Sequence, residues 1–86
     1  SLLTASPANV IVDTIKPAED GDGWVVRLYE SAGIRAAATL DFGVDIASVW
    51  MSNTLEDRIE ALATEGRRYR LALRPFQIAT LRIFQA

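Results

Sequence analysis

Apolar and polar residues alternate along much of this chain with a period of two, which is the signature of a β-strand with one buried face. The clearest alternation covers residues 34–42, where one face carries Ile34, Ala36, Ala38, Leu40 and Phe42. Residues 68–74 repeat the pattern, with apolar side chains between arginines. We therefore predict two strands, each with one face in the core. The inward residues include Leu40, Phe42, Leu71 and Leu73.

Turn-forming residues separate the apolar runs at the short spacing of an all-β fold. The segment Asp20-Gly21-Asp22-Gly23 tolerates positive φ, so residues 10–15 and 24–30 are expected to form neighbouring antiparallel strands. Residues 24–30 are apolar on both faces, which is typical of a strand that is covered on both sides. The pattern predicts one all-β domain over residues 1–86, a small antiparallel β-sandwich of about six to seven strands.

The last apolar run changes phase. Pro75 has no N–H to donate, so a sheet tolerates it only at an edge, a bend or a bulge. Phe76 and Ile78 lie out of phase with Leu81 and Ile83, and we predict one extra residue in the strand as the cause. This run is more apolar than one face of a small sheet needs. It therefore predicts a surface that contacts another domain, formed by Phe76, Ile78, Leu81, Ile83 and Phe84.

Residues 54–65 are ambiguous. Leu55, Ile59 and Leu62 have helical spacing, and Thr54 and Gly66 are suitable as the two caps of a short helix. Periodicity alone favours a helix over this segment, and extended structure is the alternative.

The composition removes whole classes of chemistry. The chain of 86 residues has no cysteine and no histidine, which excludes disulfides, thiolate nucleophiles, imidazole bases and the usual zinc ligands. No apolar run approaches the ~20 residues that cross a bilayer, so no membrane partner is expected. We predict no catalytic, cofactor-binding or metal-binding residue. The chain also lacks an initiating methionine, and we interpret it as part of a longer polypeptide.

Charge is distributed unevenly around a net value of −2. All eleven acidic residues lie within residues 1–66, whereas residues 67–86 carry five arginines and no acid. A basic patch for nucleic acid is one interpretation. The negative net charge and the alternation of the arginines along a strand favour a solvated sheet face, neutralised by acids on neighbouring strands. We therefore expect no nucleic-acid partner.

Two further candidate sites have simpler explanations. The Asp20-Gly21-Asp22-Gly23 segment resembles part of a calcium loop, but its third ligand is missing and Glu30 lies too far along the chain. Glu19, Asp20 and Asp22 could serve as a glycosidase carboxylate pair only if one of them had a raised pKa, which a solvated turn does not provide. A hairpin turn accounts for all of these residues.

Aromatic residues raise the alternative of sugar binding. Trp24 and Trp50 are the candidate sugar-facing side chains, because binding modules stack pyranose rings on exposed indoles. Both lie within strand patterns, where aromatic residues are also expected as core residues. The alternative function is thus a free-standing carbohydrate-binding β-sandwich.

Two segments carry a family resemblance. Ala18-Glu19-Asp20-Gly21-Asp22-Gly23-Trp24 through Glu30, and Leu73-Arg74-Pro75-Phe76-Gln77-Ile78-Ala79-Thr80-Leu81-Arg82, resemble the C-terminal β-sandwich of bacterial-type glycoside hydrolase family 38 α-mannosidases. The resemblance covers residues 9–84. Family members carry a proline within the segment that corresponds to residues 54–65, so the resemblance favours extended structure there.

The resemblance implies a role as a non-catalytic accessory domain of a multidomain α-mannosidase. The parent enzyme would hydrolyse terminal α-linked mannose in an N-terminal catalytic domain that holds zinc, and none of those catalytic residues maps onto this chain. The implied partners are the upstream domains of the same polypeptide and the glycan substrate of the parent, and a homo-oligomer is left open. A cytoplasmic location is favoured if the source is bacterial.

Overall fold

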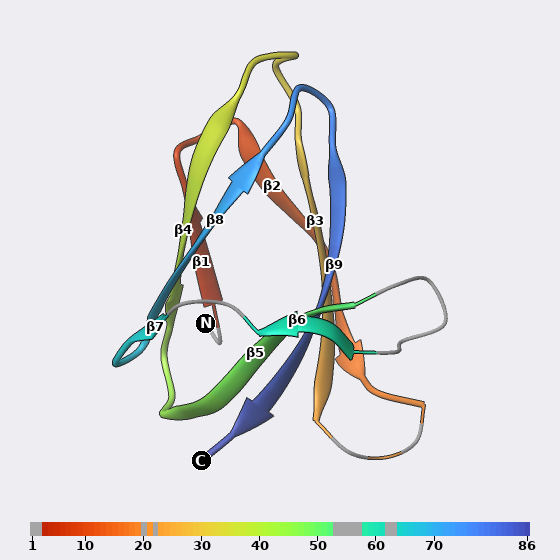
Figure 1. Cartoon of the computed structure of the whole chain (residues 1–86), viewed down its shortest axis with the longest axis vertical. Helices are drawn as coiled ribbons and strands as arrows, with labels where there is room; N and C mark the ends of the chain where they lie inside the picture. Colours follow the sequence, from red (N-terminus) through yellow and green to blue (C-terminus); the bar gives the residue numbers. More distant parts are fainter. Residues whose placement is uncertain (1–2, 20, 22, 53–57, 62–63) are drawn as a thin grey trace.

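The computed structural model describes residues 3–19, 21, 23–52, 58–61 and 64–86, and every strand in it pairs antiparallel to its neighbours. The strands of this described part are β1 Leu3–Ser6, β2 Val10–Pro17, β3 Trp24–Glu30, β4 Ala36–Phe42, β5 Ile46–Ser52, β6 Arg58–Ala61, β7 Thr64–Glu65, β8 Arg68–Leu73 and β9 Ile78–Gln85. They form two sheets that face each other (Figure 1). The predicted all-β sandwich is confirmed.

The strand order defines the two layers. One sheet has four strands in the order β1-β4-β8-β7, and the other has five in the order β2-β3-β9-β5-β6. The core lies between them, and its largest fully buried members include Tyr69, Leu28, Leu40, Leu73, Leu81 and Ile83. Tyr69 meets Phe42 edge to face, with ring centroids 5.6 Å apart. Aliphatic side chains from both sheets thus supply most of the core, as the low aromatic content requires.

The two alternating runs pair with each other as β4 and β8. Leu40, Phe42 and Leu73 are buried as predicted, whereas Leu71 is only half-buried against the core. Ile34 is the exception in the first run, because β4 begins at Ala36 and the Ile34 side chain is 57% exposed. Ile34 and Arg35 belong to the turn before β4, so the strand begins two residues later than the alternation predicts.

The predicted hairpin of residues 10–15 and 24–30 is confirmed as β2 and β3. Its register shifts once, between Val12 and Thr14, so that Asp13 is the extra residue. On β3, the neighbouring residues Val25 and Val26 are both buried although they point to opposite faces. The outer face of β3 is thus covered at Val25 but not along the strand, since Arg27 is exposed and Tyr29 is half-buried.

The bulge predicted in the closing strand is wrong. β9 pairs with β3 from Ile78 to Ile83 without a register shift. Pro75 and Phe76 precede the strand and belong to a turn, so they do not disturb its pairing. Ile78 points to the outer face of the five-stranded sheet, and the buried residues Ala79, Leu81 and Ile83 occupy the inner face. The change of phase is a change of face within a regular strand.

The ambiguous middle segment is extended wherever the structure describes it. β6 pairs with β5, and the two-residue β7 pairs with β8. Residues 53–57 and 62–63 lie outside the described part of the chain, including both Leu55 and Leu62 of the helical pattern.

The expected neutralisation between acidic and basic segments occurs on the sandwich surface. Arg68 on β8 contacts Asp41, its direct partner on β4, at 2.9 Å, and Arg67 contacts Asp45 at 2.8 Å. All four side chains are about half exposed or more. Exposed pairs of this kind contribute about 0–1 kcal/mol each to the free energy of unfolding. Their main effect is to balance charge on the surface of the sheet.

Replacement of Leu71 by alanine tests the assignment of faces. We expect a cost of about 2 kcal/mol, the low end of the range for core leucines, because the side chain is half-buried. Thr39→Ala, on the outer face of the same sheet, should cost less than about 0.5 kcal/mol. Urea unfolding measures both values. Equal costs would show that the inner and outer faces are misassigned.

Candidate functional site

Two turns meet at one end of the sandwich. The turn between β3 and β4, residues 31–35, lies beside the turn between β8 and β9, residues 74–77, at the top of Figure 1. Glu30 is the last residue of β3 and points inward, and its side chain is completely buried. A buried carboxylate demands hydrogen-bond partners, and the two turns supply most of them.

Five donors surround the Glu30 carboxylate. The donors to Oε1 are the backbone N–H groups of Gly33 at 2.6 Å, Phe76 at 3.0 Å and Ile34 at 3.1 Å. The donors to Oε2 are Nδ2 of Asn9 at 2.7 Å and the backbone N–H of Ala32 at 2.7 Å. The carboxylate thereby ties together three separate parts of the chain: the residue before β2 and both turns. We call this arrangement the Glu30 clamp.

The clamp keeps its carboxylate ionised. Burial on its own would raise the pKa of Glu30, but the hydrogen bonds from Phe76, Asn9, Ala32 and Gly33 outweigh that effect and lower the pKa from 4.5 to about 2. A general acid needs a pKa close to the working pH, and a general base needs access to its substrate. The pKa of Glu30 is far below neutral pH and its side chain is buried, so it meets neither requirement. This carboxylate instead stabilises the two turns.

The turn of residues 74–77 is held in an unusual conformation. The N–H of Gln77 donates to the carbonyl of Arg74 at 3.0 Å, and the Gln77 side chain accepts from the Arg74 N–H at 2.8 Å. Phe76, third in the turn, has a φ of 58°. Glycine or asparagine normally occupies such a position, because other side chains are strained there. The Phe76 ring lies against Gly33, where a Cβ would come within 2.6 Å of it.

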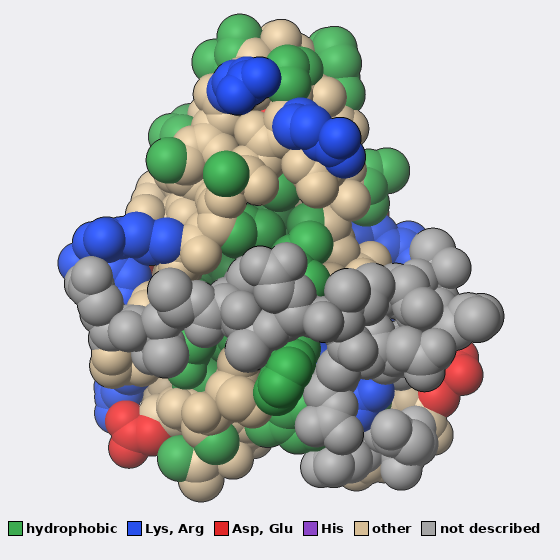
Figure 2. Space-filling model, viewed as in Figure 1, with side chains coloured by type: hydrophobic (Ala, Val, Ile, Leu, Met, Phe, Trp, Pro, Cys, Tyr) green, Lys and Arg blue, Asp and Glu red, His purple; other side chains and the backbone are tan. Residues whose placement is uncertain are grey.

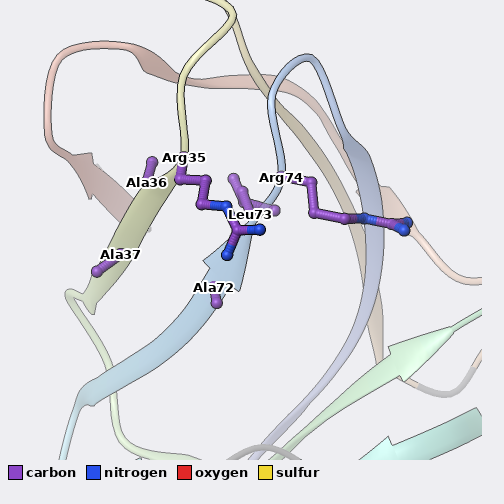
Figure 3. A pocket seen from close by; sticks show the side chains of 6 residues that line it. All are labelled: Arg35, Ala36, Ala37, Ala72, Leu73 and Arg74. Carbon is purple, nitrogen blue, oxygen red and sulfur yellow. The ribbon is translucent and has the colours of Figure 1, made fainter.

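Exposed apolar and basic side chains gather around these turns. Ile34, Phe76 and Ile78 are 57%, 68% and 66% exposed, respectively. Arg35 and Arg74 flank a shallow depression lined by Ala36, Ala37, Ala72 and Leu73 (Figure 3). Figure 2 shows basic and hydrophobic side chains side by side at this end of the molecule. We call the group of Ile34, Arg35, Arg74, Phe76 and Ile78 the loop-end surface.

The interdomain surface predicted from the sequence is only partly accessible. Leu81 and Ile83 are buried in this domain's own core because they occupy inward positions of β9, so they are removed from that surface. Phe84 is half-buried, with the Arg82 guanidinium 5.2 Å from its ring centroid. Phe76 and Ile78 are the predicted members that are freely exposed.

The two candidate sugar-facing tryptophans do not form one platform. Trp24 pairs with Ile83 and packs against the core, whereas Trp50 pairs with Arg82 on the opposite face of the same sheet. Both rings are half-buried. Their indole N–H groups donate within the domain, from Trp24 to Gln85 Oε1 at 3.4 Å and from Trp50 to Ser48 Oγ at 3.1 Å.

The glycines of the predicted hairpin turn have the positive φ angles expected of them. Gly21 and Gly23 both have positive φ, and Asp20 and Asp22 lie outside the described residues. Within the described part of the chain, no three histidine, cysteine, aspartate or glutamate side chains lie close enough to hold a metal ion. In those same residues no helix is long and apolar enough to cross a membrane.

Sequence reasoning missed the Glu30 clamp and the pair of Arg35 and Arg74. A signal for the clamp was present, since Glu30 lies in phase with the inward side chains of Val26 and Leu28 and is followed by a Ser-Ala-Gly turn. A carboxylate on the apolar face of a strand, next to a turn rich in free N–H groups, indicates a buried anion held by backbone donors.

Comparison with known proteins agrees with this architecture. The model of the glycosyl hydrolases family 38 C-terminal beta sandwich domain matches residues 9–81. Alpha-mannosidase G of Dictyostelium discoideum is 33% identical over 87 residues, a match that covers 95% of this chain. The chain spans only 8% of the length of that relative. This chain belongs to the family of C-terminal β-sandwich domains of family 38 glycosyl hydrolases.

Proposed function

We propose that this domain is a non-catalytic accessory module of an α-mannosidase that packs against the catalytic domain and supports it. Membership of the family and the name of the Dictyostelium relative support an α-mannosidase as the parent. The observation that carries the non-catalytic role is the Glu30 clamp. The buried carboxylate of this end of the domain has a lowered pKa and is fully engaged by backbone and amide donors, so it has no capacity for acid or base catalysis.

The zinc that the family resemblance implies for the parent does not fit this chain. Zinc sites in proteins use mainly cysteine and histidine, and the chain has neither. The described residues also bring no cluster of three acidic side chains together. We therefore place zinc, the hydrolysis of terminal α-linked mannose and the glycan substrate in other domains of the parent, and propose a cytoplasmic location if that parent is bacterial.

The isolated chain is expected to be inactive. A purified sample should hydrolyse no aryl α-mannoside above the blank and should contain no stoichiometric zinc by elemental analysis. The full polypeptide that carries this domain is the matched control, and it should hydrolyse the same substrate. Turnover by the pure isolated domain would overturn the accessory role, and an inactive full polypeptide would overturn the α-mannosidase assignment.

A further inference from the structure

We propose that the loop-end surface is the face by which this domain docks onto the preceding part of its own polypeptide, at an apolar site bordered by carboxylates. This inference rests on the proposed accessory function and names the residues and the partner chemistry that would carry it.

The conformation of the two turns is the first argument. Phe76 is held at positive φ, which costs free energy for a bulky residue, yet its side chain is two-thirds exposed and gains little from burial. The Glu30 clamp fixes this geometry through the Phe76 N–H. The strained backbone at Phe76 therefore lowers the stability of the domain while the aromatic ring stays exposed. A partner that buries the ring would offset this cost.

The grouping of exposed residues is the second argument. Among the residues whose burial the structure describes, four large hydrophobic side chains are exposed, and three of them, Ile34, Phe76 and Ile78, belong to the loop-end surface. The fourth, Ile15, lies alone near the far end of β2. Single exposed apolar residues are ordinary, whereas a group of them bordered by charge is typical of an interaction site.

Charge defines the partner. Pairing of Ala36 with Leu73 places Arg35 and Arg74 at the same end of neighbouring strands. Neither guanidinium forms an ion pair with a described acidic residue, and the carboxylate of Glu30 already accepts hydrogen bonds from donors within the domain. The surface thus keeps two positive charges among its apolar side chains. A partner with carboxylates around an apolar patch is complementary to it.

The length of the relative favours a partner on the same polypeptide. The chain corresponds to 8% of Alpha-mannosidase G, so most of such a polypeptide lies outside this domain. A covalently attached partner is present at a high effective concentration, on the order of millimolar for a short linker. A partner on the same polypeptide is therefore favoured over a separate protein.

The experiment uses the full polypeptide with a specific protease site inserted before Ser1. After cleavage, size-exclusion chromatography at low salt should show the wild-type domain bound to the remainder. The double variant Phe76→Asn and Ile78→Thr should bind about tenfold or more weakly, because it removes the exposed apolar groups. Asparagine tolerates positive φ, and threonine keeps the strand preference of isoleucine. Ile15→Thr, the matched control, should bind like the wild type.

A charge variant tests the second half of the proposal. Arg35→Glu together with Arg74→Glu should weaken binding of the cleaved domain, and the wild-type complex should weaken as salt rises. Thermal unfolding of each variant domain checks that it folds.

Wild-type dissociation after cleavage, or equal binding by Phe76→Asn/Ile78→Thr and wild type, would overturn the proposal. Dimerisation of the isolated domain that the same double variant abolishes would overturn it in favour of a second copy. The α-mannoside assay on the uncleaved polypeptide tests the proposed function separately.

Discussion

Replacement of Glu30 by glutamine should lower the melting temperature of the isolated domain by more than about 10 °C. Glutamine has nearly the same size, but it has one acceptor oxygen in place of two and it adds an NH₂ group that faces the existing donors. Several buried N–H groups in the two turns would lose their acceptor. Asp41→Asn is the control, because it also converts a carboxylate to an amide but at an exposed ion pair with Arg68. It should change the melting temperature by only a few degrees.

The pH dependence identifies the cause. Because the folded pKa of Glu30 is lowered from 4.5 to about 2, the unfolded state binds more protons between these values. The stabilisation from Glu30 is therefore complete above about pH 4.5 and is lost as the pH falls towards about 2. The difference in unfolding free energy between wild type and Glu30→Gln should shrink over that window. A difference that stays constant from pH 7 to pH 2 would refute an ionised clamp.

Replacement of Gly23 by alanine should leave the domain with little or no folding stability. Gly23 has a φ of 77°, and a Cβ there would overlap the backbone carbonyl oxygen of Ile83 and lie 3.0 Å from the Phe84 ring. That oxygen belongs to β9, which pairs with β3 from the next residue onward, so it cannot move without disturbing the centre of the sheet. We expect a cost above about 4 kcal/mol, close to the whole stability of many small domains.

Gly21→Ala separates conformational strain from steric overlap. Gly21 has nearly the same φ, 79°, but no atom lies within 4 Å of a Cβ built on it. Alanine there should cost only about 1–2 kcal/mol, the usual value for a left-handed conformation. Circular dichroism and urea unfolding of the two variants make the comparison. Similar losses at both positions would mean that the close approach of β9 to Gly23 has no energetic importance.

The sequence predicted the parts of this fold that depend on short-range pattern. Alternation located β4 and β8, and the glycine-rich turn located the β2 and β3 hairpin. The apolar residues on both faces of β3 correctly indicated that its outer face is covered at Val25. These features follow from side-chain direction in a strand, which has a fixed period of two and needs no tertiary information.

The errors occurred where hydrogen bonds to the Glu30 carboxylate determine local structure. Ile34 continues the alternation of β4, but the Glu30 carboxylate captures its N–H and keeps it in a turn. Phe76 and Ile78 were assigned to a bulged strand, because the sequence does not show that the Phe76 N–H donates to a residue 46 positions earlier. The candidate site shares this origin. A local pattern indicates the buried anion at Glu30, but it does not show that Asn9 and Phe76, 21 and 46 positions away, supply two of its donors.

The bulge at Asp13 disfavours pairing of this sheet edge with another chain. β2 is an edge strand of the five-stranded sheet, and a flat edge of eight residues would offer unpaired backbone groups to another chain. The extra residue interrupts the spacing of those groups, Lys16 adds charge, and Pro17 lacks an N–H at the end of the strand. Strand addition at this edge is thus discouraged. At the β2 edge, extension of the five-stranded sheet into the sheet of a neighbouring domain is therefore disfavoured.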